Sequence, residues 1–118
     1  MLILINGCAG FIGSHLTQQL LQQNHTIIGI DNLVTGSLQN INHLFANSNF
    51  IFIEHDIVEP YPESITKRKF DQIYHLASIA SPYHYFNNSL QTIYTNVYGL
   101  DNTLKLAVKN NCQIFVHM

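Results

Sequence analysis

The chain has 118 residues, of which 47% are hydrophobic and 10% charged, so we expect a folded globular protein and not a disordered segment. A chain of this length buries about 60 to 70% of its unfolded surface, which is enough for one domain with a modest core. The formal net charge of −2 gives no electrostatic basis for binding nucleic acid or an anionic membrane. No apolar run approaches the about 20 residues that span a bilayer, and Met1–Ile5 is too short for a signal-peptide core, so we expect a cytoplasmic protein.

The first elements are a strand over Leu2–Ile5 and a helical pattern from Ser14, joined by the turn Gly7-Cys8-Ala9-Gly10-Phe11-Ile12-Gly13. This order brings backbone N–H groups and the positive end of a helix to one point, where a pyrophosphate can bind. Gly7 can turn the chain, Gly10 lets a phosphate approach the backbone, and Gly13 lets the helix pack closely. A glycine turn can be only a turn, but its place between a strand and a helix favours a dinucleotide site.

The second strand, Thr26–Ile30, ends on Asp31, eighteen positions after Gly13. An acidic residue about twenty positions on in such a unit accepts hydrogen bonds from an adenosine ribose. A carboxylate about 4 Å from a 2′-phosphate would repel it by up to about 4 kcal/mol, and no Arg or Lys lies between Gly13 and Asp56 to offset this, so NAD is favoured over NADP. The alternative is that Asp31 is only a turn residue at the end of the strand.

The rest of the chain alternates apolar runs with helical patterns. Residues 39–49 suggest a short helix or loop, and residues 58–69 a surface connection with one helical turn. Small residues at 77–82 suit a loop close to a ligand. Three further strands and one long helix are expected, at Phe50–Ile53, Asp71–Leu76, Gln113–His117 and Ser89–Val108 respectively. The apolar stripe of that helix is expected to be Leu90, Ile93, Val97, Leu100, Leu104 and Ala107.

These elements predict an α/β fold, a Rossmann-type doubly wound parallel sheet of about five strands in the order 3-2-1-4-5, forming one dinucleotide-binding domain over residues 1–118. Ligands of such sheets bind beyond the carboxyl ends of the strands, where the order reverses. Gly7, Asp31, Asp56 and Ala77 each follow the end of a different strand, so we expect them to converge on one crevice.

Metal and disulfide chemistry are not expected. Cys8 and Cys112 lie far apart and fit no ligand spacing, and no two of the seven histidines stand at i, i+4 on one helix face.

Three motifs, at residues 6–16, 31–36 and 55–60, resemble the extended short-chain dehydrogenase/reductases of the NAD-dependent epimerase/dehydratase family. The segments at 71–78, 80–85 and 95–97 are most similar to its UDP-glucuronate decarboxylase branch. The resemblance covers nearly all of the chain but only the first part of the family's fold. It implies NAD as cofactor and oxidation of a nucleotide sugar at C4, after which the 4-keto sugar loses carboxylate, water or a stereocentre.

The resemblance also implies which residues bind NAD. The pyrophosphate would lie on Gly10, Phe11 and Ile12, within the turn from Gly7 to Gly13. The adenosine ribose would contact Asp31, Asn32, Thr35 and Gly36, and Asp56 and Ile57 would flank the adenine. Leu76, Ala77, Ser78 and Thr95 would line the nicotinamide half, with Asn96 supporting that loop.

The family's catalytic Ser/Thr and Tyr-x-x-x-Lys are not present, because no tyrosine of this sequence has Lys four residues later and the sequence stops at Met118. Asn6, Cys8, Ser37, Tyr94 and the segment 61–70 also depart from the family pattern. We therefore expect either the NAD-binding part of a nucleotide-sugar enzyme, which takes its substrate only when a C-terminal half completes it, or a non-catalytic dinucleotide-binding module or gene remnant. In both cases we expect a homo-oligomer, because the long helix and the edge at residues 114–116 would lack partners.

Overall fold

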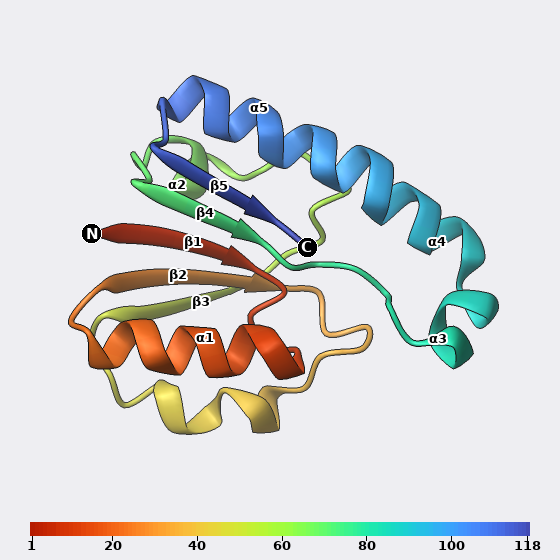
Figure 1. The fold of residues 1–118 in the computed structure, drawn as a ribbon, viewed down its shortest axis with the longest axis horizontal. Coiled ribbons are helices and arrows are strands. Elements are labelled where there is room, and N and C mark those ends of the chain that lie inside the picture. Colours follow the sequence, from red (N-terminus) through yellow and green to blue (C-terminus); the bar gives the residue numbers. More distant parts are fainter.

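The computed structural model describes the backbone of residues 1–118 and every side chain except that of Tyr85. Five parallel strands form one sheet in the order β3-β2-β1-β4-β5, as the sequence predicts. Figure 1 shows the sheet as the middle layer, with helices on both faces. The strands are β1 (Leu2–Asn6), β2 (Thr26–Asp31), β3 (Phe50–Glu54), β4 (Gln72–His75) and β5 (Ile114–His117).

Each face of the sheet has its own apolar core, because successive strand residues point to opposite faces. Ile3 and Ile5 pack with helix α1 (Phe11–Gln22), with Ile41 and with the short 3₁₀ turn η2 (Asn42–Leu44). A further 3₁₀ turn, η1 (Leu38–Asn40), precedes Ile41 and has no buried residue. Leu4 and Ile28 pack on the other side with α2 (Glu63–Thr66) and α5 (Leu100–Asn110). Burial on both faces explains why β1 and β2 are almost continuous apolar runs.

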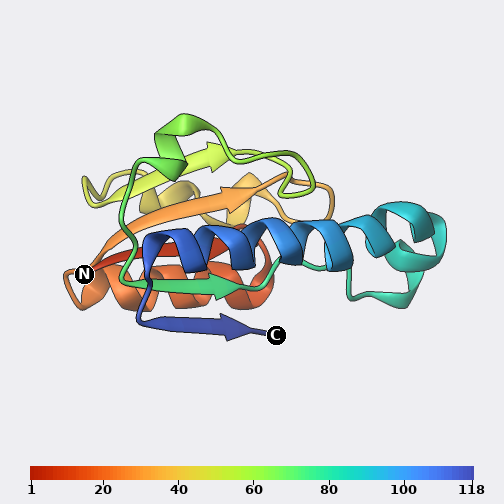
Figure 2. The same cartoon turned by 90° about the horizontal axis from the view of Figure 1, so that it is seen from above.

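The long helix differs from the prediction in its apolar face. It consists of α4 (Ser89–Tyr94), a π-helical turn η3 (Thr95–Gly99) and α5, placed end to end, with α5 beside the sheet and α4 beyond the strand ends (Figure 2). Most of the predicted stripe lies outside the core: Leu90 and Val97 are 65% and 56% exposed, as expected for a stripe without partners, and of its six residues only Ala107 is buried. A π turn holds more residues than an α turn, so it shifts the helix phase and breaks the expected stripe. The buried positions are Thr95, Gly99, Thr103, Leu106, Ala107 and Asn110.

Two connections also differ from expectation. The segment between β3 and β4 is more than a surface connection, because Ile65 and Phe70 lie in the core. Residues Pro82–Asn87 form a short helix, α3, that the sequence analysis did not predict.

Cys8 and Cys112 are free thiols. Among the described residues, no helix has both the length and the apolar character that a membrane crossing needs.

Candidate functional site

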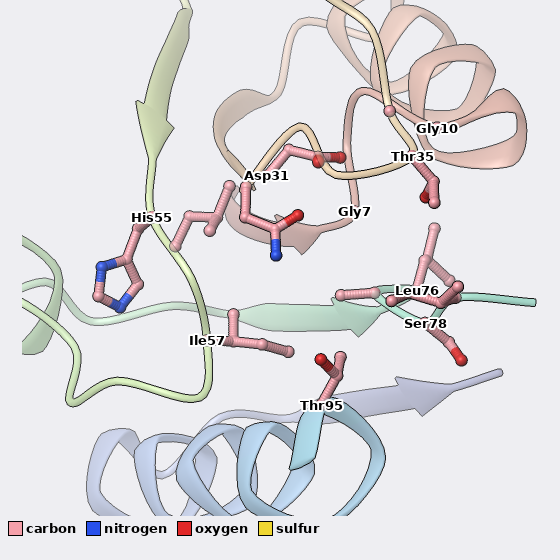
Figure 3. A pocket seen from close by; sticks show the side chains of 14 residues that line it. Gly7, Gly10, Asp31, Thr35, His55, Ile57, Leu76, Ser78 and Thr95 are labelled. Carbon is pink, nitrogen blue, oxygen red and sulfur yellow. The ribbon is translucent and has the colours of Figure 1, made fainter. Parts of the chain in front are cut away.

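The carboxyl ends of four strands meet around one pocket (Figure 3). Gly7 follows β1, Asp31 ends β2, His55 and Ile57 follow β3, and Leu76 begins the loop after β4. The pocket lies beside β1, where the sheet order reverses, and Thr95 of η3 adds a further wall. The predicted convergence is therefore present for Gly7, Asp31 and Ala77. Asp56 does not line this pocket, although both of its neighbours in the chain do.

The glycine turn has the compact geometry that its sequence predicts. Gly7 has φ +84°, and its N–H donates to the Ile30 carbonyl oxygen at 2.7 Å. A Cβ on Gly13 would overlap the Gly7 carbonyl oxygen and lie 2.8 Å from its carbonyl carbon, so α1 packs directly on the turn. A Cβ on Gly10 would meet only the Gly7 carbonyl oxygen, at 3.4 Å, so the space in front of Gly10 is open.

The start of α1 supplies donors at this opening. Gly10 is the N-cap, and no described side chain caps this end of the helix. The first amides of a helix have no intrahelical acceptor, and the helix dipole adds about half a positive charge there. The pocket wall at Gly10 therefore suits an anion such as a phosphate.

Asp31 faces these donors from the end of β2 (Figure 3). Its side chain is 9% exposed, and its two oxygens accept hydrogen bonds from the backbone N–H groups of Ala9, at 2.9 Å, and Leu33, at 2.8 Å. Gly36 packs against it, because a Cβ on Gly36 would lie 2.9 Å from a carboxylate oxygen. Asp31 is thus a turn residue and also part of the pocket wall, and its remaining lone pairs can accept further hydrogen bonds.

Thr95 has a hydroxyl group that the protein leaves unsatisfied. Its side chain is 5% exposed and lines the pocket, and Oγ1 has no hydrogen-bond partner among the described residues. Buried hydroxyl groups are almost always hydrogen-bonded, so this atom marks a place where a ligand can bind. Next to it, the Ser78 hydroxyl donates to Asn96 Oδ1 at 2.9 Å, which ties the loop after β4 to η3.

The structure separates the predicted site residues into two sets. Phe11 and Ile12 carry side chains that are 79% and 51% exposed outside the pocket, and Gly13 is buried behind the turn. Asp56 lines a neighbouring hollow, where it accepts from the Val58 N–H at 3.0 Å, and Asn96 contacts the pocket only through Ser78. The predicted residues that do line the pocket are Gly7, Gly10, Asp31, Asn32, Thr35, Gly36, Ile57, Leu76, Ala77, Ser78 and Thr95.

Sequence reasoning missed three pocket residues. Ile30, His55 and Ile79 also line the pocket. His55 directly follows β3, so the rule that selected Asp56 could have found it. Ile30 and Ile79 look like ordinary core residues in the sequence, and they carry no comparable signal.

Cys8 lies in the glycine turn, but it is not a candidate nucleophile. Its side chain is fully buried, and burial, together with the charge of Asp31, raises the pKa of its thiol far above its usual range. The thiolate form that reacts is therefore not available near neutral pH.

Comparison with known proteins identifies the family. The family model described as GDP-mannose 4,6 dehydratase matches residues 4–118. The chain belongs to this family. It is 48% identical over 105 residues to UDP-glucuronic acid decarboxylase 2 of Arabidopsis thaliana, covering 89% of this chain and 22% of the relative. It is 43% identical over 114 residues to UDP-glucuronic acid decarboxylase 1 of Danio rerio, covering 97% of this chain and 26% of the relative.

Solved structures of family members share the fold. A dTDP-glucose 4,6-dehydratase from Streptomyces venezuelae, with NAD bound, matches with a TM-score of 0.87 and 28% identity, covering 99% of this chain and 38% of that one. A UDP-glucose 4-epimerase from Thermotoga maritima, with UDP-glucose, matches with a TM-score of 0.84 and 29% identity over 99% of this chain and 37% of that one. This chain thus spans between about a fifth and two fifths of the length of the relatives that it matches.

Proposed function

We propose that this chain is the NAD-binding portion of a nucleotide-sugar epimerase, dehydratase or decarboxylase, nearest in type to the UDP-glucuronate decarboxylases. The observation that carries the proposal is the single pocket formed by the open glycine turn, the Asp31 carboxylate and the orphaned Thr95 hydroxyl. These three parts of the pocket match the parts of a dinucleotide: the turn can bind the pyrophosphate, Asp31 can accept hydrogen bonds from the adenosine ribose, and the Thr95 wall can face the nicotinamide half. Known relatives with the same fold and an NAD ligand support the proposal.

The residues of the pocket fit NAD part by part. The pyrophosphate lies at Gly10 and the first amides of α1, contributed by Phe11, Ile12 and Gly13, whose side chains need not line the pocket. Asp31, Asn32, Thr35 and Gly36 receive the adenosine ribose. Ile57 in the pocket and Asp56 in the neighbouring hollow flank the adenine. The nicotinamide half lies along the wall of Leu76, Ala77, Ser78 and Thr95, which Asn96 supports.

When bound, NAD would accept a hydride from C4 of the sugar. Asp31 disfavours NADP, because its carboxylate would repel a 2′-phosphate. The tyrosines whose side chains are described do not supply the family's base, since none has Lys four residues later in the sequence. We therefore propose that this chain alone binds the cofactor without turning over a nucleotide sugar.

Calorimetric titration tests cofactor binding directly. We expect NAD to bind the folded chain with saturable heat and AMP to bind more weakly, because AMP reaches only the adenosine wall. NADP should bind more weakly than NAD. Absence of heat at millimolar NAD, with circular dichroism confirming the folded chain, would contradict the proposal and leave a fold without a dinucleotide function.

Turnover tests the incomplete site. We expect no conversion of UDP-glucuronate by this chain with NAD, and conversion after addition of a complementary C-terminal half that carries Ser/Thr and Tyr-x-x-x-Lys. Conversion by the chain alone would show that it holds a base that the sequence does not reveal. Failure of the complemented pair, with NAD binding intact, would favour a non-catalytic dinucleotide-binding module.

We also propose that the chain is a homo-oligomer. The outer face of the long helix carries apolar side chains that are 43 to 80% exposed, which is unusual for a free surface. They are Leu90, Ile93, Tyr94, Val97, Tyr98, Leu104 and Val108. Light scattering should show a dimer or larger species, and Val97→Arg should dissociate it, whereas Gln22→Arg on exposed α1 should not. A wild-type monomer at high concentration would refute this assignment.

A further inference from the structure

A buried polar cluster joins the end of β1 to α5 outside the pocket. Asn6 Nδ2 donates to Tyr61 Oη at 2.9 Å, and Tyr61 Oη lies 2.7 Å from Thr103 Oγ1. Thr103 Oγ1 in turn donates to the Gly99 carbonyl oxygen at 2.7 Å. Asn6 and Thr103 are fully buried, and burial raises the pKa of the Tyr61 hydroxyl to about 12. The phenol therefore keeps its proton and stays a hydrogen-bond donor at neutral pH.

The bond from Thr103 to Gly99 sets the direction of the other hydrogen bonds in the cluster. Thr103 has a single hydroxyl proton and gives it to Gly99, so Tyr61 must donate to Thr103 and the Asn6 amide must donate to Tyr61. The Asn6 amide nitrogen also lies 3.2 Å from His75 Nδ1, which accepts because burial lowers the pKa of His75 to about 4 and keeps the ring neutral. The hydrogen bonds thus run in one direction, from β1 to the Gly99 carbonyl.

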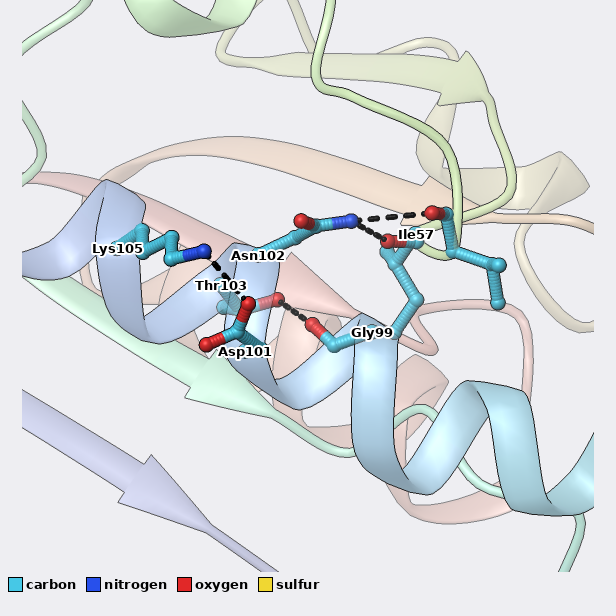
Figure 4. Close-up of polar contacts among 7 residues, drawn as sticks. Ile57, Gly99, Asp101, Asn102, Thr103 and Lys105 are labelled. Carbon is cyan, nitrogen blue, oxygen red and sulfur yellow. Dashed lines mark hydrogen bonds and ion pairs between the residues drawn. The ribbon is translucent and has the colours of Figure 1, made fainter.

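Gly99 is the point at which this cluster meets the pocket. It ends η3, the π-helical turn that begins at Thr95. A Cβ on Gly99 would lie 2.6 Å from Ile57 Cδ1, so Gly99 is held between the pocket wall and α5. Figure 4 shows the Thr103 bond to Gly99 and the nearby Asn102 side chain. Asn102 Nδ2 donates to the carbonyl oxygens of Ile57, at 2.9 Å, and Val58, at 3.1 Å.

A π-helical turn needs such support. It is rare, and its hydrogen bonds are less regular than those of an α-helix, so neighbouring contacts decide where its residues lie. The Thr103 bond fixes the carbonyl at the end of η3, and the packing of Gly99 on Ile57 fixes its distance from the pocket. Both contacts set the phase of the turn that carries Thr95 into the pocket wall.

We propose that Asn6, Tyr61 and Thr103 are positioning residues that hold η3 so that the Thr95 hydroxyl faces the bound ligand. This inference rests on the proposed NAD site and adds to it a set of residues that do not touch the ligand. Thr95 and Ser78 form the wall across from Asp31 (Figure 3). The hydrogen bonds of the cluster end at η3, which carries Thr95, whereas the packing of Gly99 on Ile57 does not depend on the Thr103 hydroxyl group. We therefore expect the loss of these hydrogen bonds to act on the half of NAD beyond the pyrophosphate more than on the adenosine half.

Thr103→Val tests the proposal, with Thr103→Ser as the matched control that keeps the hydroxyl group. The valine variant removes the three hydrogen bonds of the Thr103 hydroxyl group, with Asn6, Tyr61 and Gly99. Because only the bond to Gly99 reaches η3, we expect the variant's dissociation constant for NAD to rise about two- to tenfold, the usual net effect of one hydrogen bond. Its dissociation constant for AMP should stay within about twofold of wild type. The serine variant should bind NAD as wild type does. Equal losses for NAD and AMP would overturn the proposal, because they would indicate a general loss of structure.

A double-mutant cycle asks whether the cluster acts through Thr95. If it does, Thr103→Val should weaken NAD binding in the wild-type background and add no further loss in a Thr95→Val background. Tyr61→Phe should behave in the same way, because it removes the donor to Thr103. Additive losses in the cycle would show that Thr103 does not act through Thr95.

Hydrogen exchange of the ligand-free chain separates this inference from the proposed function. In Thr103→Val, the amide protons of η3 should exchange about two- to tenfold faster than in wild type, while those of β1 and β2 should not change. If the folded wild-type chain binds neither NAD nor AMP, the proposed function fails, and the exchange of η3 still decides whether the cluster positions the turn. Unchanged exchange in η3 would refute the positioning role.

Discussion

The same substitution, Gly to Ala, should impair stability at one glycine of the turn and NAD binding at another. Gly13 and Gly10 lie three residues apart, but a methyl group on Gly13 would overlap the Gly7 carbonyl group, whereas one on Gly10 would enter open space. Replacing Gly with Ala in a helix is ordinarily stabilising by up to about 1 kcal/mol. Overpacking against backbone atoms costs about 1 to 3 kcal/mol or more, and the Gly7 backbone cannot rotate away as a side chain could.

For Gly13→Ala, overpacking outweighs the gain in helix propensity, so we expect a net destabilisation of about 2 kcal/mol. For Gly10→Ala, the backbone angles of φ −79° and ψ 178° suit alanine. Alanine is a poorer N-cap residue than glycine, which lowers the stability of the folded chain, but it also restricts the unfolded chain, which raises stability by a similar amount. The free energy of unfolding should therefore change by less than about 0.5 kcal/mol. Its NAD affinity should nevertheless fall at least about tenfold, because the methyl group occupies the space through which a phosphate approaches the amides.

Urea unfolding measures the first effect, and calorimetric titration with NAD measures the second. Wild-type stability in Gly13→Ala would show that α1 does not pack on the turn as described. Wild-type NAD affinity in Gly10→Ala would place the pyrophosphate elsewhere. Either result would refute the assignment of the glycine turn as a phosphate site packed under a helix.

Three further predictions concern charge and packing. Burial, with a smaller contribution from His117, lowers the pKa of His75 from 6.5 to about 4, so between these values the unfolded chain binds a proton that the folded chain does not. Stability should therefore be full above pH 6.5 and fall on the order of 3 kcal/mol as the pH drops toward 4, and urea unfolding across this range should show a smaller fall in His75→Phe. Asp31→Asn removes the charge that repels a 2′-phosphate, so calorimetry should show the affinity for NADP rising about tenfold relative to the affinity for NAD. An unchanged ratio of the two affinities would mean that Asp31 does not face the ribose. On α5, Leu106 is 4% exposed and Leu104 is 43% exposed. In urea unfolding at low protein concentration, Leu106→Ala should therefore lower the free energy of unfolding by about 2 to 5 kcal/mol, and Leu104→Ala by less than about 0.5 kcal/mol. Equal losses would contradict the packing of α5.

The sequence determined the strands, their order and the place of the pocket. The apolar runs of β1 and β2 are recognisable because parallel strands are buried on both faces, and this requirement is local to each run. Right-handed crossovers then leave few possible orders for the sheet. Gly7 and Asp31 were found for the same reason, since each stands where a buried strand ends and a turn begins.

Only the tertiary structure decided which side chains face one another. The helical stripe from Leu90 to Ala107 was predicted with an uninterrupted period of 3.6 residues, and the π turn at Thr95–Gly99 broke that period. Ile79 lines the pocket although it looks like an ordinary apolar residue in the sequence, because the loop after β4 brings it beside residues from three other strand ends. The contacts of Asn6 with Tyr61 and Thr103 join residues 55 and 97 positions apart, and no local pattern encodes a hydrogen bond over such a separation.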